Sequence, residues 1–191
     1  MTKKILITGA NGQLGHEMRN ALKGNNRFEC IFTDVAELDI CNAEAVKQII
    51  ADNHIDYIVN CAAYTQVDKA EDNAELCKKI NTDAVENLAR AAATYGARMI
   101  HISTDYVFNG RGYRPYTEDV VPDPQSVYGS TKLEGEKILT DICPESIIIR
   151  TAWLYSPYGN NFVKTMLHLG EEREELSVVA DQILSLIHIS E

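Results

Sequence analysis

Short apolar runs rich in β-branched residues recur along the chain, and each is followed by a stretch with helical character. Nearly continuous hydrophobicity within such runs is typical of strands that are covered on both faces of a parallel sheet. The predicted strands span residues 3–8, 28–33, 56–63, 98–104 and 146–151, with a further short one at 176–180. Helices are predicted at residues 13–23, 43–53, 74–94, 126–141 and 161–173. The alternation predicts an α/β fold with a doubly wound parallel sheet.

Composition and charge narrow the range of partners. A chain of 191 residues suits one domain, or one domain and the start of a second. The formal net charge of −10 argues against nucleic acid or an anionic membrane surface as the main partner, because both are negatively charged. No run approaches the roughly 20 apolar residues that span a bilayer, and the first apolar run is too short for a signal peptide. We therefore expect a cytoplasmic protein with no nucleic acid or membrane partner.

The cysteines and histidines show neither a disulfide framework nor a metal-ligand pattern. The five cysteines are scattered without a Cys-x-x-Cys pair, and the five histidines have no ligand spacing with each other or with the cysteines. Reduced thiols are expected of a cytoplasmic protein. The sequence therefore predicts no metal site.

The first predicted strand runs into the glycine-rich segment ILITGANGQLGHEM. Gly9, Gly12 and Gly15 have the spacing G-x-x-G-x-x-G, which differs from the usual dinucleotide fingerprint G-x-G-x-x-G. Glycines still permit a tight turn and close approach of the backbone to a pyrophosphate at the helix N-terminus. Asp34 ends the second predicted strand about 20 residues on, where an acid is expected to grip the ribose hydroxyls. A Rossmann-like dinucleotide site is favoured over a plain glycine-rich turn.

The same acid bears on the choice of cofactor. Asp34 would repel a 2′-phosphate, and no Arg or Lys adjoins it, so NADH is expected to be at least as acceptable as NADPH. Asp39, in the segment LDI, is a candidate for contact with the adenine edge or else a solvated loop acid. The segment CAAY, residues 61–64, ends the third strand with small residues. These either leave room for a ligand or serve helix–sheet packing, and the pattern leaves both alternatives open.

The stretch QSVYGSTKLEGEK places Tyr128 and Lys132 four residues apart at the start of a predicted helix, so that they share one face. A nearby ammonium favours the phenolate and lowers the pKa of a phenol toward neutrality, which suits proton transfer. Alone, the pair is explained equally well as a surface Tyr–Lys pair. The glycine loop favours the catalytic interpretation, as do the polar residues 103–106 at the carboxyl end of the fourth strand.

Four segments together resemble the extended short-chain dehydrogenase/reductases: TGANGQLG, STDYVF, YGSTKLEGEK and RTAWLYSPYGNNF. The segment AAYTQVDKAE fits the same resemblance, which extends from residue 1 to about residue 182. Members of this kind pass a hydride from a reduced nicotinamide to C4 of a 4-keto-6-deoxy nucleotide sugar. The resemblance therefore implies an NADPH- or NADH-dependent ketoreductase acting on a dTDP-linked 4-keto-6-deoxy sugar, and it is compatible with a homodimer.

The resemblance also implies roles for individual residues. Tyr128 would protonate the developing alkoxide, Lys132 would hold the nicotinamide ribose and depress the pKa of Tyr128, and Thr104 would hydrogen-bond the reacting oxygen. Trp153 would lie beside the sugar, although it is also explained as a core aromatic residue. Implied substrate contacts are Thr104, Asp105, Tyr106 and Trp153. Implied cofactor contacts are Gly9, Asn11, Gly12, Gln13, Leu14, Gly15, Asp34, Asp39, Ile40, Ala62, Ala63, Tyr64, Thr65, Ile102, Tyr128 and Lys132.

The end of the chain departs from the family pattern. Related proteins continue from VVADQ into a Gly/Pro-containing turn and further helices, whereas ILSLIHISE follows here. That segment is predicted to be an apolar, strand-prone tail with no partner to cover it. We expect a dinucleotide-binding domain at residues 1–150, the start of the substrate-binding part at 151–182, and a non-native tail at 183–191. Most of the smaller carboxyl-terminal substrate domain would then be missing.

Two other functions are compatible with the same motifs. One is a regulatory protein that binds the cofactor without turnover, because a shared fold does not guarantee shared chemistry. The other is an epimerase or dehydratase acting on a nucleotide sugar. A dehydratase typically carries Asp-Glu after the threonine, whereas Thr104 is followed here by Asp105 and Tyr106. This favours simple reduction.

Overall fold

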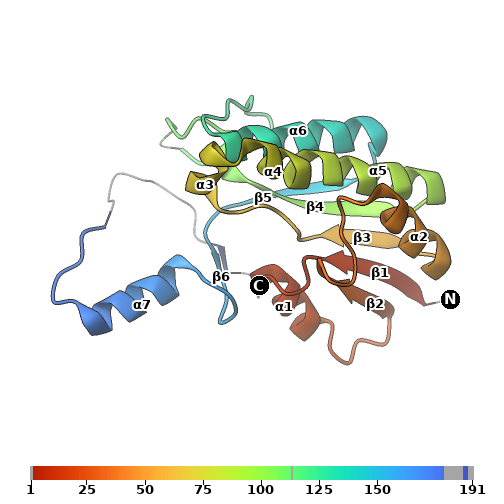
Figure 1. Ribbon diagram of the computed structural model, residues 1–191, viewed down its shortest axis with the longest axis horizontal. Coiled ribbons are helices and arrows are strands. Elements are labelled where there is room, and N and C mark those ends of the chain that lie inside the picture. The colour runs from red at the N-terminus through yellow and green to blue at the C-terminus, as the bar shows by residue number, and fades with distance from the viewer. Residues whose placement is uncertain (1, 113, 179–186, 189–191) are drawn as a thin grey trace.

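A parallel sheet organises the structure, a computed structural model that describes residues 2–112, 114–178 and 187–188. Its strands are β1 (Lys3–Thr8), β2 (Phe28–Thr33), β3 (Tyr57–Asn60), β4 (Arg98–Thr104) and β5 (Ile147–Thr151). They lie in the order β2-β1-β3-β4-β5, and each pairs with its neighbours in parallel (Figure 1). The predicted α/β sheet is thereby confirmed, with β3 shorter than expected. The strand order reverses between β1 and β3, which is where ligands bind in such sheets.

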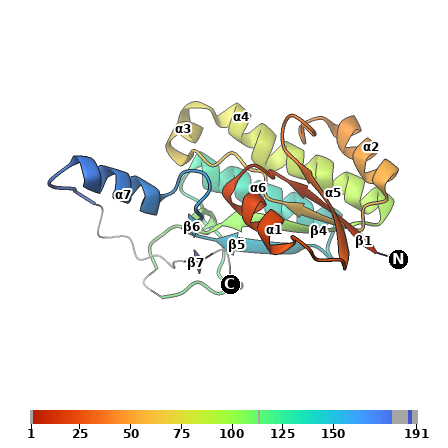
Figure 2. The same ribbon diagram turned by 90° about the horizontal axis from the view of Figure 1, so that it is seen from below.

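The two faces of the sheet are covered unequally. Helices α2 (Ala43–Asn53), α5 (Ala84–Tyr95) and α6 (Val127–Ile142) lie on one face, and α1 (Gln13–Ala21) lies on the other (Figures 1 and 2). The larger core joins Leu6, Ile58 and Met99 of the sheet to buried residues of α2, α5 and α6. A smaller core, centred on Ile7 and Val59, packs under α1. The helices predicted for the segments of α1, α2 and α6 are confirmed, within a few residues at their ends.

The segment predicted as one helix at residues 74–94 is interrupted. It consists of α4 (Ala74–Lys78), a single π-helical turn η1 (Lys79–Asp83) and α5. A short helix that was not predicted, α3 (Val67–Asp72), precedes it. π turns of this kind are often found at functional sites. Here Asn81 within η1 is buried and hydrogen-bonds to the backbone of the chain after β3.

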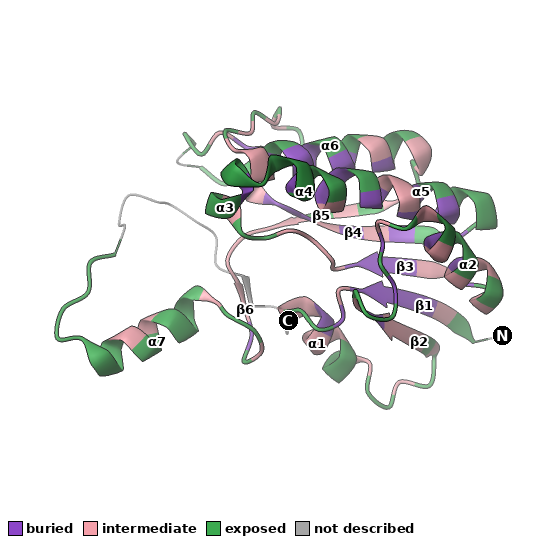
Figure 3. Cartoon of the chain, in the orientation of Figure 1, coloured by how far each residue is buried: buried purple, intermediate pink, exposed green. Residues whose placement is uncertain are grey.

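The last helix, α7 (Phe162–Glu172), extends away from the sheet in both views and has no buried residue (Figures 1 to 3). It follows a short strand, β6 (Leu154–Tyr155). The strand predicted at residues 176–180 is wrong for residues 176–178, which form no regular structure, and its remainder lies outside the described residues. Nothing in the described chain pairs with residues 176–178 as a sheet neighbour would.

The predicted tail at residues 183–191 lies mostly outside the described residues. Its described part, β7 (Ile187–His188), pairs in parallel with β6 through Leu154 and Tyr155. The expectation that this apolar segment has no partner is therefore wrong for these two residues, because they form a two-stranded sheet with β6. No helix in the described ranges is long and apolar enough to cross a membrane. The same residues contain no cluster of three or more side chains suited to a metal ion.

Candidate active site

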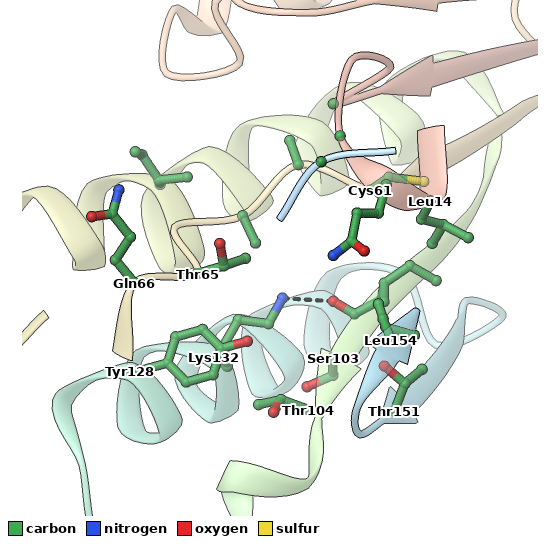
Figure 4. A pocket seen from close by; sticks show the side chains of 18 of the residues that line it. Leu14, Cys61, Thr65, Gln66, Ser103, Thr104, Tyr128, Lys132, Thr151 and Leu154 are labelled. Atoms are coloured by element: carbon green, nitrogen blue, oxygen red, sulfur yellow. Dashed lines mark hydrogen bonds between the residues drawn. The ribbon is translucent and has the colours of Figure 1, made fainter. Parts of the chain in front are cut away.

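A cleft of about 1410 Å³ opens at the carboxyl ends of β1, β3 and β4. The glycine loop after β1 forms one end of it, and residues from β4 and α6 form the other. Figure 4 shows Thr65 and Gln66 on one side of this space and Ser103, Thr104, Tyr128 and Lys132 on the other. Residues distant in the sequence therefore converge where the strand order reverses, as the fold predicts for a ligand site.

The glycine loop is shaped by close backbone contacts. Gly9 has a left-handed backbone (φ +65°), and a Cβ there would lie 2.6 Å from the nitrogen of Ala62. At Gly15 a Cβ would lie 2.5 Å from Cα of Ala10, so the missing side chain lets α1 pack against the loop. Gly12 is the N-cap of α1 and offers no side-chain cap to the first N–H groups of the helix. These donors therefore remain suited to a phosphate group.

Asp34 ties the end of β2 to this loop. Its Oδ2 accepts a hydrogen bond from the backbone N–H of Asn11 at 2.9 Å, and its Oδ1 accepts one from Val35 at 2.8 Å. Glu37 in turn accepts a hydrogen bond from the Asp34 backbone N–H at 2.9 Å. The carboxylate of Asp34 therefore lies at the cleft beside the glycine loop, and that of Glu37 adjoins it. Their combined negative charge opposes a phosphate there.

Lys132 projects from α6 into the other end of the cleft with only 1% of its surface exposed. Its ammonium nitrogen lies 2.6 Å from the backbone oxygen of Ile102, the contact drawn in Figure 4, and 3.2 Å from Nε2 of His101. Burial lowers the pKa of Lys132 to about 8, although Glu136 and Cys77 act in the opposite direction. A lysine with this pKa exchanges its proton close to neutral pH.

Tyr128 behaves differently from the sequence expectation. Burial raises the pKa of its phenol to about 12, partly opposed by a hydrogen bond with the Thr104 side chain. The expected lowering of the Tyr128 pKa by Lys132 is therefore wrong for this arrangement. Removal of the phenol from water penalises the phenolate more than the neighbouring groups stabilise it. Tyr128 thus holds its proton at neutral pH, which suits a proton donor better than a base.

The end of β4 places three more predicted residues beside this phenol. Thr104 donates to Asp105 Oδ1 at 3.2 Å and accepts from the backbone N–H of Tyr106 at the same distance, which begins the 3₁₀ turn η2 (Asp105–Val107). Burial raises the pKa of Asp105, with its hydrogen bond to Thr104 opposing. The Tyr106 ring meets Tyr128 edge to face, with centroids 5.5 Å apart. The hydroxyls of Thr104 and Tyr128 are thereby held together.

Trp153 lines the cleft and is not a core residue. Its backbone is left-handed (φ +52°), which is unusual for a bulky side chain, and such strain often marks functional sites. Its ring meets Phe162 edge to face at 4.8 Å. Just beyond, Asn161 Nδ2 donates to Gln13 Oε1 at 3.0 Å, so this segment is fastened to the start of α1.

Most of the predicted cofactor contacts line the same cleft. Asp39 and Ile40 do so, and Asp39 also accepts a hydrogen bond from the backbone N–H of Cys41 at 2.9 Å. Two predicted contacts, Gly15 and Tyr64, lie outside the cleft lining; Gly15 is buried in packing and the backbone of Tyr64 is held by Asn81. The others that line it are Gly9, Asn11, Gly12, Gln13, Leu14, Asp34, Ala62, Ala63, Thr65, Ile102, Tyr128 and Lys132.

Comparison with known proteins shows the family. The family described as RmlD substrate binding domain matches residues 3–185. The chain belongs to this family. Curated relatives include the dTDP-4-dehydrorhamnose reductases of Aggregatibacter actinomycetemcomitans and Escherichia coli K12. They are 46% identical over 180 residues and 47% identical over 182 residues, covering 94% and 93% of this chain. The chain spans 61% and 60% of the length of these two relatives.

Solved structures agree with the sequence relatives. The dTDP-4-dehydrorhamnose reductase of Clostridium acetobutylicum superimposes with a TM-score of 0.95 at 50% identity, covering 98% of this chain and 66% of the other. The reductase of Bacillus anthracis, in complex with NADP, also has a TM-score of 0.95, at 43% identity, covering 100% of this chain and 68% of the other. The Rossmann-like fold of the chain is thus that of its family.

Behind the cleft lies a group of buried polar residues that the sequence analysis missed. Glu136, 4% exposed, forms an ion pair with Arg150 (2.6 Å between Nη2 and Oε2) and accepts a hydrogen bond from Ser103. On the sheet, Asn60 and His101 are fully buried. Two features of the sequence could have indicated these residues. Asn60 and His101 are polar residues inside otherwise apolar strands, and Glu136 is an acid one helical turn after Lys132.

Proposed function

We propose that the chain is the nucleotide-binding and catalytic part of an NAD(P)H-dependent reductase. It would convert the C4 ketone of dTDP-4-dehydro-L-rhamnose to the alcohol of dTDP-L-rhamnose, the last step of dTDP-rhamnose synthesis. The observation that carries the proposal is the convergence of Tyr128, Lys132 and Thr104 at one end of a cleft whose other end is the glycine loop. Two relatives that are 46% and 47% identical to this chain are dTDP-4-dehydrorhamnose reductases.

The glycine-loop end fits a dinucleotide. The crowding that a side chain would meet at Gly9 and the uncapped N–H groups of α1 leave a backbone cradle for a pyrophosphate. Asp34 would hold the adenosine ribose, and residues 61–65 would line the path toward Lys132. When bound, the reduced nicotinamide supplies the hydride for C4. We assign residues 1–150 to dinucleotide binding and residues 151–182 to the start of the substrate-binding part.

The chemical end would supply the proton. As the carbonyl oxygen of the substrate gains negative charge, the Tyr128 hydroxyl would protonate it and Thr104 would hydrogen-bond the same oxygen. The raised pKa of Tyr128 keeps the donor protonated before the reaction. Lys132 would hold the nicotinamide ribose. The C4 ketone gains one hydride and one proton, so no further reactant is needed.

The sugar itself would lie between the two sides of the outer cleft. Asp105 and Tyr106 would approach it from the end of β4, and Trp153 from the loop after β5. Trp153 offers a flat apolar surface of the kind that packs against a sugar ring. Asp105 and Tyr106 follow Thr104 without the Asp-Glu pair of a dehydratase, and this supports reduction over elimination of water.

The test is consumption of NADH or NADPH by the chain in the presence of dTDP-4-dehydrorhamnose, compared with Tyr128→Phe. Loss of the proton donor should reduce turnover by about 10²–10⁴-fold while leaving cofactor affinity nearly unchanged. Tyr95→Phe, at the exposed end of α5, is the matched control and should keep full activity. Equal turnover by Tyr128→Phe would remove its proposed role. If a complete chain that includes the carboxyl-terminal substrate domain binds the cofactor without any turnover of the sugar, the regulatory function is supported instead.

A further inference from the structure

A row of buried polar side chains crosses the sheet beneath the cleft. Thr8, Asn60 and His101 are register partners on β1, β3 and β4, with 1%, 0% and 0% of their surfaces exposed. Thr8 Oγ1 donates to Asn60 Oδ1 at 2.6 Å, and Asn60 Nδ2 lies 3.1 Å from His101 Nδ1. His101 Nε2 lies 3.2 Å from Nζ of Lys132. The row thus runs from the residue before Gly9 to the lysine of the site.

A backbone contact fixes the orientation of the Asn60 amide. The N–H of Ala62 lies 3.2 Å from Asn60 Oδ1 and can only donate, so the atom facing it must be the amide oxygen. The NH₂ group of Asn60 therefore faces His101. Because an NH₂ group also only donates, Nδ1 of His101 must accept this hydrogen bond and carries no proton.

The proton of His101 must then be on its other nitrogen. Because its Nδ1 accepts and carries no proton, the ring is neutral, and burial also lowers the pKa of His101 well below its usual value. A neutral ring without a proton on Nδ1 carries it on Nε2, which faces Lys132. Lys132 already donates to the backbone oxygen of Ile102 at 2.6 Å. An ammonium group can only donate, so its N–H would face the N–H of His101 with no acceptor between them. A neutral amine has a lone pair that accepts the His101 N–H.

Other groups around Lys132 act in the opposite direction. Glu136, one turn further along α6, and Cys77, from α4, both raise the pKa of Lys132. Burial outweighs them. Burial and these two groups therefore act on Lys132 in opposite directions, and a hydrogen bond from His101 adds to the side of burial.

We propose that Thr8 and Asn60 orient His101 as a hydrogen-bond donor to Lys132, and that His101 is a positioning residue that favours the neutral amine of this lysine. The arrangement belongs to the folded chain itself and is independent of any substrate. Its bearing on reduction, where Lys132 stands on the same helix face as Tyr128, rests on the function proposed above. If the chain fails to turn over the sugar, this inference is therefore unaffected. If the tests below contradict the inference, the proposed function is likewise unaffected.

The first test reads the tautomer of His101 by nitrogen NMR of the isotope-labelled wild-type chain, with His101→Gln identifying the signal. We expect a proton on Nε2 and none on Nδ1 at a pH above the titration of Lys132. A proton on Nδ1 would overturn the proposal. The measurement needs neither cofactor nor activity, and sequential assignment of the wild-type chain identifies the His101 signal if the variant does not fold.

The second test follows the side-chain NMR signal of Lys132 through a pH titration, with Lys132→Met identifying it. In His101→Gln, the amide can turn its oxygen toward Lys132 and accept from the ammonium. The titration midpoint of Lys132 should therefore rise by roughly one pH unit, the size expected for one hydrogen bond. His168→Gln, on the exposed face of α7, is the matched control and should leave the midpoint unchanged. A midpoint in His101→Gln equal to that of the control would contradict the proposal.

Discussion

The two ends of the cleft owe their shape to different parts of the chain, the backbone at one end and side chains at the other. At the glycine-loop end the shape comes from the backbone, with crowding around Gly9 and Gly15 and exposed acids at the rim. At the chemical end it comes from side chains such as the buried Lys132, with the buried Glu136 behind them. The first end should therefore be sensitive to any added Cβ atom. The second should be sensitive to changes of charge or hydrogen bonding that leave the volume almost unchanged.

The largest effect on the backbone end is expected from Gly9→Ala. The left-handed conformation costs about 1–2 kcal/mol for an L-residue, and overpacking against Ala62 costs about 1–3 kcal/mol more. Gly24→Ala is the matched control, because Gly24 is also left-handed (φ +76°) but has nothing within 4 Å. Urea unfolding should show a greater loss of unfolding free energy for Gly9→Ala. Equal losses would mean that crowding contributes nothing at this loop.

At the chemical end, Glu136→Gln keeps the volume and removes the charge opposite Arg150. We expect a loss of roughly 2–4 kcal/mol in the free energy of unfolding, somewhat reduced because Arg150 is partly exposed. Glu134→Gln, two residues earlier, removes an exposed charge whose partner Lys78 is 3.8 Å away. It should change stability by less than about 1 kcal/mol. Similar losses of unfolding free energy in the two variants would show that the buried ion pair contributes no more to stability than the exposed one.

The buried lysine should make stability depend on pH. The folded pKa of Lys132 is about 8 and the ordinary value is 10.5, so between these pH values the unfolded chain binds the extra proton. Stability contributed by this site therefore rises with pH across that window, by on the order of 3 kcal/mol. The unfolding free energy of Lys132→Met, measured over the same pH range, is subtracted from that of the wild-type chain. This removes the contribution of cysteines and tyrosines, whose titration acts in the opposite direction. A flat difference curve would mean that Lys132 titrates normally in the folded chain.

The smallest effect is expected at the exposed rim of the glycine-loop end. Asp34→Ala removes a carboxylate from the proposed ribose site together with its charge. Binding of NADH should weaken several-fold, while NADPH should weaken less or bind better, because repulsion of the 2′-phosphate is reduced. Fluorescence titration with both cofactors measures this ratio. An unchanged ratio would place Asp34 away from the ribose.

The same comparison explains what the sequence could predict. Motifs at both ends are local, so Gly9, Asp34, Tyr128 and Lys132 could be placed from strand ends and helix periodicity. The partners of Lys132 could not, because His101 on β4 meets it only through the packing of α6 against the sheet. The pKa of Tyr128 was mispredicted for the same reason. A neighbour four residues away is visible in the sequence, whereas the depth of burial is not.

The interrupted helix was also beyond local reasoning. Residues 74–94 have continuous helical character, and nothing in their composition marks the π turn η1. Residues 176–178 were wrongly predicted as a strand because their β-branched character is also local. Such a run becomes a strand only where a neighbouring strand is available.

The π turn at Lys79–Asp83 sets the rotational phase of everything that follows it on that helix. Each residue of an α-helix advances the chain by about 100°, and a π turn absorbs one residue beyond the α-helical count. Removing a single residue from this turn would restore an unbroken α-helix and rotate α5 by about that angle relative to α4. Leu88 and Ala92, which are now fully buried, would then leave the sheet. The extra residue in the π turn therefore allows α4, which borders the cleft, and α5, which covers the core, to bury different faces.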